Sequence, residues 1–571
     1  MNPYYPIYTE KAECQDCYKC VRQCPTKAIT VRNGKASVIE ERCVLCGNCV
    51  QVCPVGAKHV RNDLQRAKRL LTTKEKVIVS LAPSFISEFR DISKSQLIAA
   101  IKALGFYGVS ETALGAQEVS AHIAHSMEKD EPRLYVSSAC PTVVQMIKKH
   151  YPQHADVVTD LYSPLLAHCA MLRQEYGEDI GILFFGPCIA KKAEADGYET
   201  LLDLAVTFKG LRAWWAEEGI DPAQMPDHPE NVFIPRQAQE GALYPIDGGM
   251  ISSIKANCTY NDSSCMSFSG MEEIENILEN LDTFPKSPLF LELLACKGGC
   301  VNGPHMTDKT STALKRLSIL DYAAVPQNEF PRQPSCNINN RFEFTPVQNI
   351  SFEEAKIRDT LHDIGKYSAT DELNCSGCGY DSCRDFAVAI LAGKAEKDMC
   401  VSYMRELAHK KANALIKAMP SGVVIVDEKL HVVECNRNFS RLLGSDIEMA
   451  FEAKPGMRGA NLAKLIDFSS YFQTVLNTGD DILNKNIQNG DTVLNVSIFS
   501  IEQHRIVGGI IQDITAPAMH KEQIISKTQE VIEKNLATVQ KIAYLLGENA
   551  SETEVLLDSI TQSFRVESVR K

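Results

Sequence analysis

In the middle of the chain, apolar residues gather into short runs that alternate with longer amphipathic stretches. Residues 77–85, 133–141 and 180–188 each predict a buried strand that ends in a loop. Residues 95–106 and 141–151 have the hydrophobic spacing of helices. Strands that alternate with helices predict an α/β domain with parallel sheets, whose sites form at the carboxyl ends of the strands.

Further along, the pattern changes to strands with alternating apolar and polar positions. Residues 418–444 predict a strand, a polar turn, a second strand and a helix that begins at Asn436. Residues 483–515 predict three more strands joined by turn residues. We therefore expect an α+β domain over residues 408–516.

Residues 517–571 predict a helical tail. Apolar side chains recur there at seven-residue intervals: Ile525, Ile532, Val539 and Leu546. This spacing is equally typical of a short coiled coil and of a helix packed on the preceding domain. We find no nucleotide-binding loop, phosphoacceptor histidine region or DNA-binding helix pair, so any output is expected to pass to another protein.

Composition and charge exclude several classes of protein. A chain of 571 residues is too long for one core, so three to five domains are expected. No apolar stretch approaches the roughly 18 residues of a membrane helix, and the first residues do not resemble a signal peptide. A net charge of −12 disfavours nucleic acid as a partner. We expect a cytoplasmic protein that binds neither membrane nor nucleic acid.

The 21 cysteines favour metal chemistry over disulfide bonds. Disulfide scaffolds are typical of small secreted chains, whereas these cysteines form short-spaced groups in a long chain. Two groups have gaps of two, two and three residues, and each is followed by proline. This doubled pattern, within residues 1–65, resembles a bacterial two-cluster ferredoxin, in which the fourth cysteine of each run binds the other cluster. The predicted ligands are Cys14, Cys17, Cys20 and Cys53 for one [4Fe-4S] cluster, and Cys43, Cys46, Cys49 and Cys24 for the second. Structural zinc is the weaker alternative.

Three segments within residues 76–365 resemble the signature segments of the [FeFe]-hydrogenase active-site domain. In chain order they are SSACP, GPCIAKKAE and LELLACKGGCVNGP. The resemblance implies that Cys140, Cys188, Cys296 and Cys300 hold a [4Fe-4S] cluster. Cys300 would also bridge to a di-iron subcluster that carries CO, cyanide and an azadithiolate, which completes the H-cluster. Lys191 would donate a hydrogen bond to a cyanide, with the Glu194 carboxylate nearby.

Departures from the family pattern point away from an ordinary hydrogenase. Ala139 stands where the family has a cysteine that passes protons, and the acidic relay residues align with Ile123 and Ser126, with Glu118 and Glu128 close by in the sequence. A missing proton relay lowers turnover without preventing binding, because positioned proton transfer contributes about 10²–10⁴-fold. Further changes affect the expected pocket: Gly186 and Leu294 replace two methionines, beside Pro187 and Ser138. The pattern resembles the sensory branch of the family.

A third cysteine group occupies residues 366–402. Its spacing resembles that of the small four-cysteine [4Fe-4S] domain of corrinoid iron–sulfur proteins, and its cysteines are Cys375, Cys378, Cys383 and Cys400. Asp381 or Ser382 would cap the helix that begins near Cys383. Zinc is the alternative metal here.

The remaining cysteines are expected to be small buried hydrophobic residues. This applies to Cys169, Cys258, Cys265, Cys336 and Cys435. As alternatives, Cys258 and Cys265 keep a local redox or metal role, and Cys435 a contact with flavin or haem. Residues 412–515 resemble a PAS domain, which senses a ligand or transmits a conformational change, commonly as a homodimer.

The combined hypothesis is a hydrogen or redox sensor of the [FeFe]-hydrogenase type. It would activate dihydrogen reversibly and slowly, and CO would inhibit it. Electrons would be exchanged with an acceptor such as ferredoxin. The signal would pass through the PAS domain and tail to a kinase or phosphatase. Two alternatives remain: a catalytic hydrogenase regulated by its PAS domain, and an iron–sulfur scaffold without the di-iron unit.

Overall fold

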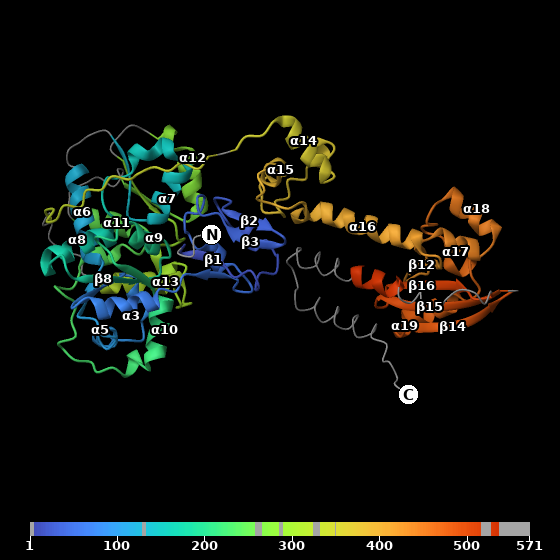
Figure 1. Ribbon diagram of the computed structural model, residues 1–571, viewed down its shortest axis with the longest axis horizontal. Coiled ribbons are helices and arrows are strands. Elements are labelled where there is room, and N and C mark those ends of the chain that lie inside the picture. Colours follow the sequence, from blue (N-terminus) through green and yellow to red (C-terminus); the bar gives the residue numbers. More distant parts are fainter. Residues whose placement is uncertain are drawn as a thin grey trace. The chain divides into compact units, whose positions relative to one another are not determined.

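The computed structural model describes residues 5–127, 133–256, 265–284, 289–323, 332–348, 350–490, 492–515 and 527–535. The chain divides into two compact units, residues 1–396 and 397–571 (Figure 1). Among the described helices, none is both long and apolar enough to cross a membrane.

The N-terminal part of the first unit repeats one small pattern twice. In each half a residue with positive φ, Tyr18 (56°) or Gly47 (82°), precedes a four-residue helix that carries a cysteine. These helices are α1 (Lys19–Arg22) and α2 (Asn48–Gln51). Two antiparallel pairs complete the module: β1 (Ile7–Thr9) with β4 (Lys58–Val60), and β2 (Ile29–Arg32) with β3 (Lys35–Val38).

The α/β domain that follows contains two parallel sheets, as the alternating pattern predicted. The four-stranded sheet has the order β6-β5-β8-β9 and the three-stranded sheet the order β10-β11-β7. The bounds are β5 (Val77–Leu81), β6 (Gly108–Glu111), β7 (Leu134–Val136), β8 (Gly181–Gly186), β9 (Leu204–Thr207), β10 (Cys265–Ser269) and β11 (Leu289–Leu294). Adjacent strands of each sheet are parallel.

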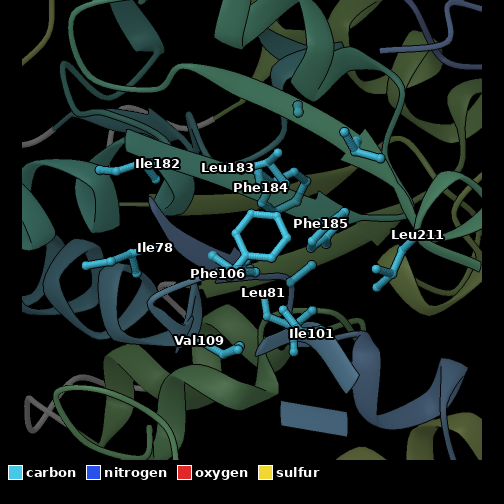
Figure 2. Close-up of a cluster of buried hydrophobic side chains, with 14 of the residues drawn as sticks. Ile78, Leu81, Ile101, Phe106, Val109, Ile182, Leu183, Phe184, Phe185 and Leu211 are labelled. Carbon is cyan, nitrogen blue, oxygen red and sulfur yellow. The ribbon is translucent and has the colours of Figure 1, made fainter. Parts of the chain in front are cut away.

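Helices surround these sheets, and apolar side chains fill the space between the layers. Their bounds are α3 (Leu64–Thr73), α4 (Phe85–Glu88), α5 (Lys94–Lys102), α6 (Ala113–Met127), α7 (Pro141–His150), α8 (Pro164–Tyr176), α9 (Ala190–Gly197), α10 (Phe208–Glu218), α11 (Gly249–Lys255), α12 (Met271–Glu279) and α13 (Thr312–Tyr322). Figure 2 shows Phe106 and Phe185 among aliphatic side chains such as Ile78 and Val109. The Phe106 ring meets Phe185 and Trp214 edge-on, with ring centroids 5.8 and 5.7 Å apart.

The last part of the first unit contains α14 (Glu354–Asp363) and α15 (Cys383–Leu391). Ser382 is the N-cap of α15, and its hydroxyl accepts a hydrogen bond from Asp385 N at 3.0 Å. Of the two caps that the sequence allowed, the structure therefore uses Ser382.

The second unit begins with the long helix α16 (Val401–Ala418) and continues into a five-stranded antiparallel sheet of order β13-β12-β16-β15-β14. The five predicted strands and the helix beginning after Asn436 are all present. The elements are β12 (Gly422–Asp427), β13 (Val432–Cys435), α17 (Arg437–Leu442), α18 (Ser445–Ala453), α19 (Ser469–Thr478), β14 (Ile482–Asn489), β15 (Thr492–Glu502) and β16 (Ile506–Asp513). The multidomain α/β fold class is thus confirmed.

Little of the predicted tail lies within the described residues. Residues 527–535, which include Ile532, are helical. Ile525, Val539 and Leu546 lie outside the described residues, so the choice between coiled coil and packed helix stays a prediction.

A buried histidine joins the four-stranded sheet to α8. His168 is fully buried; its Nδ1 and Nε2 each lie 2.8 Å from a serine hydroxyl, on Ser80 and Ser110 respectively. Ser80 Oγ is also 2.7 Å from Thr112 Oγ1. Burial lowers the pKa of His168 to about 3, so the ring is neutral in the folded protein.

We expect this histidine to make the α/β domain sensitive to acid. An unfolded histidine binds a proton below about pH 6.5, whereas folded His168 does not. The contribution of neutral His168 to the free energy of unfolding is therefore fully present above pH 6.5 and is lost as the pH falls toward 3. At pH 5.5 the loss should be about 1.4 kcal/mol. Denaturant unfolding followed by tryptophan fluorescence measures it, because both tryptophans, Trp214 and Trp215, lie in this core. His168→Gln should flatten this pH dependence and exposed His228→Gln should not; equal slopes would contradict the assignment.

Candidate active site

Four cysteines from three separate loops line one cavity of about 100 Å³ in the α/β domain. Cys140 follows β7, Cys188 follows β8, and Cys296 and Cys300 follow β11. The strands belong to two sheets, and their carboxyl ends open toward the same space. The structure therefore brings together the cysteines that the three signature segments predicted.

Burial and mutual repulsion both oppose ionisation of these thiols. Burial, and after it the nearby Cys140 thiol, raise the pKa of Cys188 to about 11. Burial also raises the pKa values of Cys296 and Cys300 well above their usual range. Cys300, Cys188 and Cys140 raise the pKa of Cys296 further, and Cys140 and Cys188 raise that of Cys300 further. Four clustered thiolates need a positively charged group among them. This donor set fits an iron–sulfur cluster.

The turn that carries Cys300 depends on two glycines. Gly298 and Gly299 have φ values of 80° and 96°, a region that other residues rarely adopt. A Cβ atom at Gly299 would lie 2.3 Å from the Pro245 carbonyl oxygen, and one at Gly303 would lie 2.8 Å from Pro187 Cβ. These glycines let the loop pack against neighbouring chain, which fixes the position of Cys300.

Lys191 lines the same cavity and is held by two oxygen atoms. It lies on α9, and its Nζ donates to Ser163 Oγ at 2.9 Å and to Glu194 Oε2 at 2.6 Å. Both side chains of the ion pair are 10% exposed. The pair places a cation at the cavity wall, with its carboxylate partner one helical turn further along the helix.

The other predicted pocket residues divide into two groups. Ala139, Pro187 and Leu294 line the cavity, whereas Ser138 and Gly186 are not among the lining residues. Ser138 Oγ accepts a hydrogen bond from Thr159 Oγ1 at 3.0 Å. A Cβ at Gly186 would lie 2.3 Å from the ring of Phe184, which does line the cavity.

The upstream helix brings no acidic side chain to this cavity. Ala116 is the residue of α6 that lines it. Ile123 belongs to an apolar cluster, and the Ser126 hydroxyl donates to His122 O at 2.9 Å. Glu118 is buried, and its carboxylate accepts hydrogen bonds from Ser335 and from Cys336 N. Glu128 lies outside the described residues.

Two polar residues at the cavity were missed from the sequence. Ser84 is 1% exposed, and its hydroxyl has no hydrogen-bond partner in the protein. Glu292 lies in the buried strand β11, and burial raises the pKa of its carboxyl to about 7. The sequence does contain a signal for Glu292, because an acidic residue stands within the apolar run LELLA. The unpartnered Ser84 hydroxyl fits a cofactor that carries polar groups into this cavity.

The ferredoxin-type cysteines lie in two sets of four. Cys20 is buried and lies in the electrostatic field of Cys17, Cys14 and Cys53, while Cys49 lies in that of Cys43, Cys46 and Cys24. Cys46 also lines the active-site cavity. It raises the pKa of Cys296 as well, by less than burial and the other cavity thiols do. The second set therefore adjoins the cavity.

The third cysteine group spans the division of the chain. Cys375, Cys378 and Cys383 belong to the first unit, and Cys400 immediately precedes α16 in the second. Cys383 is the first residue of α15. Across the described chain, no three Cys, His, Asp or Glu side chains converge as a single metal ion requires.

The cysteines outside these groups are largely buried. Cys169 and Cys435 are 0% and 4% exposed, in the cores of the α/β domain and the antiparallel domain. Cys265 and Cys336 are partly buried, and Cys258 lies outside the described residues.

Comparison with protein families supplies four matches along the chain. Residues 75–304 match the iron only hydrogenase large subunit, C-terminal domain, and residues 13–57 match a 4Fe-4S dicluster domain. Residues 371–402 match an Fe-S cluster family, and residues 411–482 match the PAS domain. This chain is an [FeFe]-hydrogenase-like protein with a PAS domain.

Curated relatives are similar at low identity. Iron hydrogenase 1 of Clostridium pasteurianum is 24% identical over 376 residues, which are 53% of this chain and 66% of that protein. The periplasmic [Fe] hydrogenase large subunit of Nitratidesulfovibrio vulgaris is 25% identical, over 55% of this chain and 92% of the relative. NADP-reducing hydrogenase subunit HndD of Solidesulfovibrio fructosivorans is 23% identical, over 56% of this chain and 60% of the relative. The chain thus spans less than two thirds of the first and third relatives.

Solved structures with similar parts include a variant of [FeFe]-hydrogenase HydA1 from Chlamydomonas reinhardtii, at 18% identity and a TM-score of 0.37. That match covers 48% of this chain and 91% of the other. The PAS domain of an HTR-like protein from Haloarcula marismortui matches at 18% identity and a TM-score of 0.14, over 19% of this chain and 94% of the other.

Proposed function

We propose that this chain is a hydrogen or redox sensor built on an [FeFe]-hydrogenase active site. One observation carries the proposal: a single cavity is lined by Cys140, Cys188, Cys296, Cys300 and Lys191, and Ala139 lines it where the family has its proton-passing cysteine. The cavity keeps what cofactor binding needs. It lacks the thiol that rapid proton delivery needs.

Several of the lining residues would then have a role toward the H-cluster. The four cysteines would hold its cubane, and Cys300 would bridge to the di-iron unit with its CO, cyanide and azadithiolate. When bound, the cofactor supplies the chemistry of dihydrogen activation. Lys191 and Ser84 would donate hydrogen bonds to its polar groups, and the hydrogen bond to Glu194 orients Lys191. Apolar residues such as Leu294 and Phe184 exclude water.

Glu292 favours one rival proposal. Its buried carboxyl lines the cavity, and with a pKa near 7 it is able both to bind and to release a proton around neutral pH. A catalytic hydrogenase whose turnover is regulated by the PAS domain is therefore the second candidate function. The turnover of the unmodified protein separates the two candidates.

Electrons would pass between the cavity and external partners through the cysteine groups. We assign [4Fe-4S] clusters to the two ferredoxin-type sets and to Cys375, Cys378, Cys383 and Cys400, with a ferredoxin as the external redox partner. Dihydrogen and protons would be the substrates and CO an inhibitor. Such thiolate-bound clusters suit a reducing compartment, which we take to be the cytoplasm.

The second unit offers a mechanical connection from the third cluster to the output. Helix α16 begins directly after Cys400 and is 18 residues long, about 27 Å. At its far end the Asn436 amide donates to Ile416 O at 2.9 Å and to Ser421 O at 2.8 Å, and Asn438 donates to Met419 O at 2.7 Å. Asn436 Oδ1 also accepts from Val423 N and Phe439 N. These amides would transmit a displacement of α16 to the PAS sheet, and from there, through the tail or a homodimer, to a kinase or phosphatase.

Our first prediction concerns the H-cluster. Protein matured anaerobically should show infrared bands of iron-bound CO and cyanide, and Cys300→Ser should abolish them by removing the bridging thiolate. The matched control is Cys169→Ser, which changes a buried thiol that does not line the cavity. The CO and cyanide bands should persist in this control variant. Absence of the bands in matured wild-type protein would establish the scaffold without a di-iron unit instead.

Proton delivery gives a second prediction. Ala139→Cys should raise hydrogen turnover at least tenfold if the missing thiol limits the rate. Ala116→Cys is the control, since it adds a thiol to the same cavity from α6. Equal effects of the two variants would show that position 139 has no special role. Wild-type turnover equal to that of ordinary hydrogenases would favour the catalytic candidate.

The signalling route gives a third prediction. Hydrogen exchange of α16 should differ between protein held under dihydrogen and oxidised protein, and Asn438→Ala should reduce that difference while leaving cluster spectra unchanged. Asn436→Ala should have the larger effect, because this buried amide makes more bonds. Exposed Asn477→Ala serves as the control. Identical exchange in both redox states of the wild type would exclude this route.

A further inference from the structure

The segment that carries Cys375, Cys378 and Cys383 rests directly on the ferredoxin module within the first unit. The Arg22 guanidinium donates to the Gly377 carbonyl at 3.2 Å and to the Cys17 carbonyl at 3.1 Å, so it connects two cysteine loops. Backbone contacts extend the interface, since Val31 N donates to Lys394 O at 2.9 Å and Gly34 N donates to Glu396 Oε2 at 3.1 Å.

Gly379 brings the two backbones into close contact. Its φ is +93°, and a Cβ atom there would lie 2.8 Å from Val21 Cγ1 and 3.0 Å from Arg22 N. Only glycine fits this approach to α1 without displacement. The approach places the next residue, Tyr380, at the interface.

Tyr380 is buried there with an unsatisfied hydroxyl. The residue is 5% exposed, and its OH has no hydrogen-bond partner in the protein. Its ring contacts Phe386, with centroids 5.7 Å apart, which fixes its orientation. A buried hydroxyl without a partner costs about 1–3 kcal/mol, so an acceptor at this place would stabilise it.

The neighbours of this hydroxyl are cysteines of two different sets. Burial raises the pKa of the Tyr380 phenol, and Cys378 and Cys24 raise it further. Cys24 belongs to the same set as Cys46, which reaches the active-site cavity. Cys24, Cys46, Cys296 and Asp381 also line one groove of about 740 Å³. The set that includes Cys24 therefore lies between the cavity and the four-cysteine segment.

We propose that Tyr380 donates a hydrogen bond from its hydroxyl to a sulfur atom at the contact between the Cys24 set and the Cys378 set, and so tunes the reduction potential of the cluster that accepts it. The proposal rests on the cluster assignments of the proposed function. Tyr380 acts as a positioning residue and keeps its proton. Reduction makes a cluster more negative, and a donor to its sulfur stabilises that form, so the hydrogen bond raises the potential.

The test uses the full chain with its clusters in place. Tyr380→Phe removes the hydroxyl and keeps the ring, and Tyr367→Phe, at a side chain that is 71% exposed in the same segment, is the matched control. A redox titration followed by electron paramagnetic resonance should show one cubane becoming harder to reduce by about tenfold, or about 59 mV for a one-electron couple. The other cubanes and the control should be unchanged. Pulsed measurements should show an exchangeable proton near that cubane in wild type and its loss in Tyr380→Phe.

The outcomes separate this inference from the cluster assignments. Unchanged midpoint potentials and an unchanged proton signal, in protein with full iron content, would overturn the role of Tyr380 and leave the clusters in place. Wild-type protein without cubane signals from these two sets would overturn the assignments themselves.

Discussion

Burial of four thiols in one apolar cavity is the constraint on which the rest of this molecule depends. Cys140, Cys188, Cys296 and Cys300 come from three loops at the carboxyl ends of strands in two different sheets. Their burial and mutual repulsion raise the pKa values of several of these thiols. A protein gains nothing from this arrangement unless a positively charged metal group binds there and compensates for the cost of ionisation.

The ferredoxin module is fitted to this cavity. Cys46 lines the cavity, and a Cβ at the neighbouring Gly47 would lie 2.6 Å from Pro304 Cβ and 2.9 Å from Ile189 Cδ1. The left-handed turn before α2 therefore also lets the two domains touch. The module also contacts the four-cysteine segment through Arg22 and Gly379. One small module thus contacts both other cysteine sites of the first unit.

In the proposed sensor, the second unit would carry the signal to the output. Its long helix begins beside a cysteine of the third group and ends in the hydrogen bonds of Asn436 and Asn438. Helices transmit displacement well because their backbone hydrogen bonds lie within the element. Phe439, Phe472 and Val424 are fully buried in the apolar core of the PAS domain, and such cores are close-packed.

The sequence by itself determined the order of the domains, the strand-ending cysteines and the antiparallel character of the second domain, because spacing and periodicity are local properties. It also marked Ala139, whereas Glu292 was missed. Only the tertiary structure decided which side chains share the cavity: Gly186 and Ser138 lie outside its lining, and Glu118 bonds to Ser335. Within the described residues it also left the hydroxyls of Ser84 and Tyr380 without partners. Such neighbours come from distant segments, and their contacts depend on how sheets and loops pack, which no local pattern encodes.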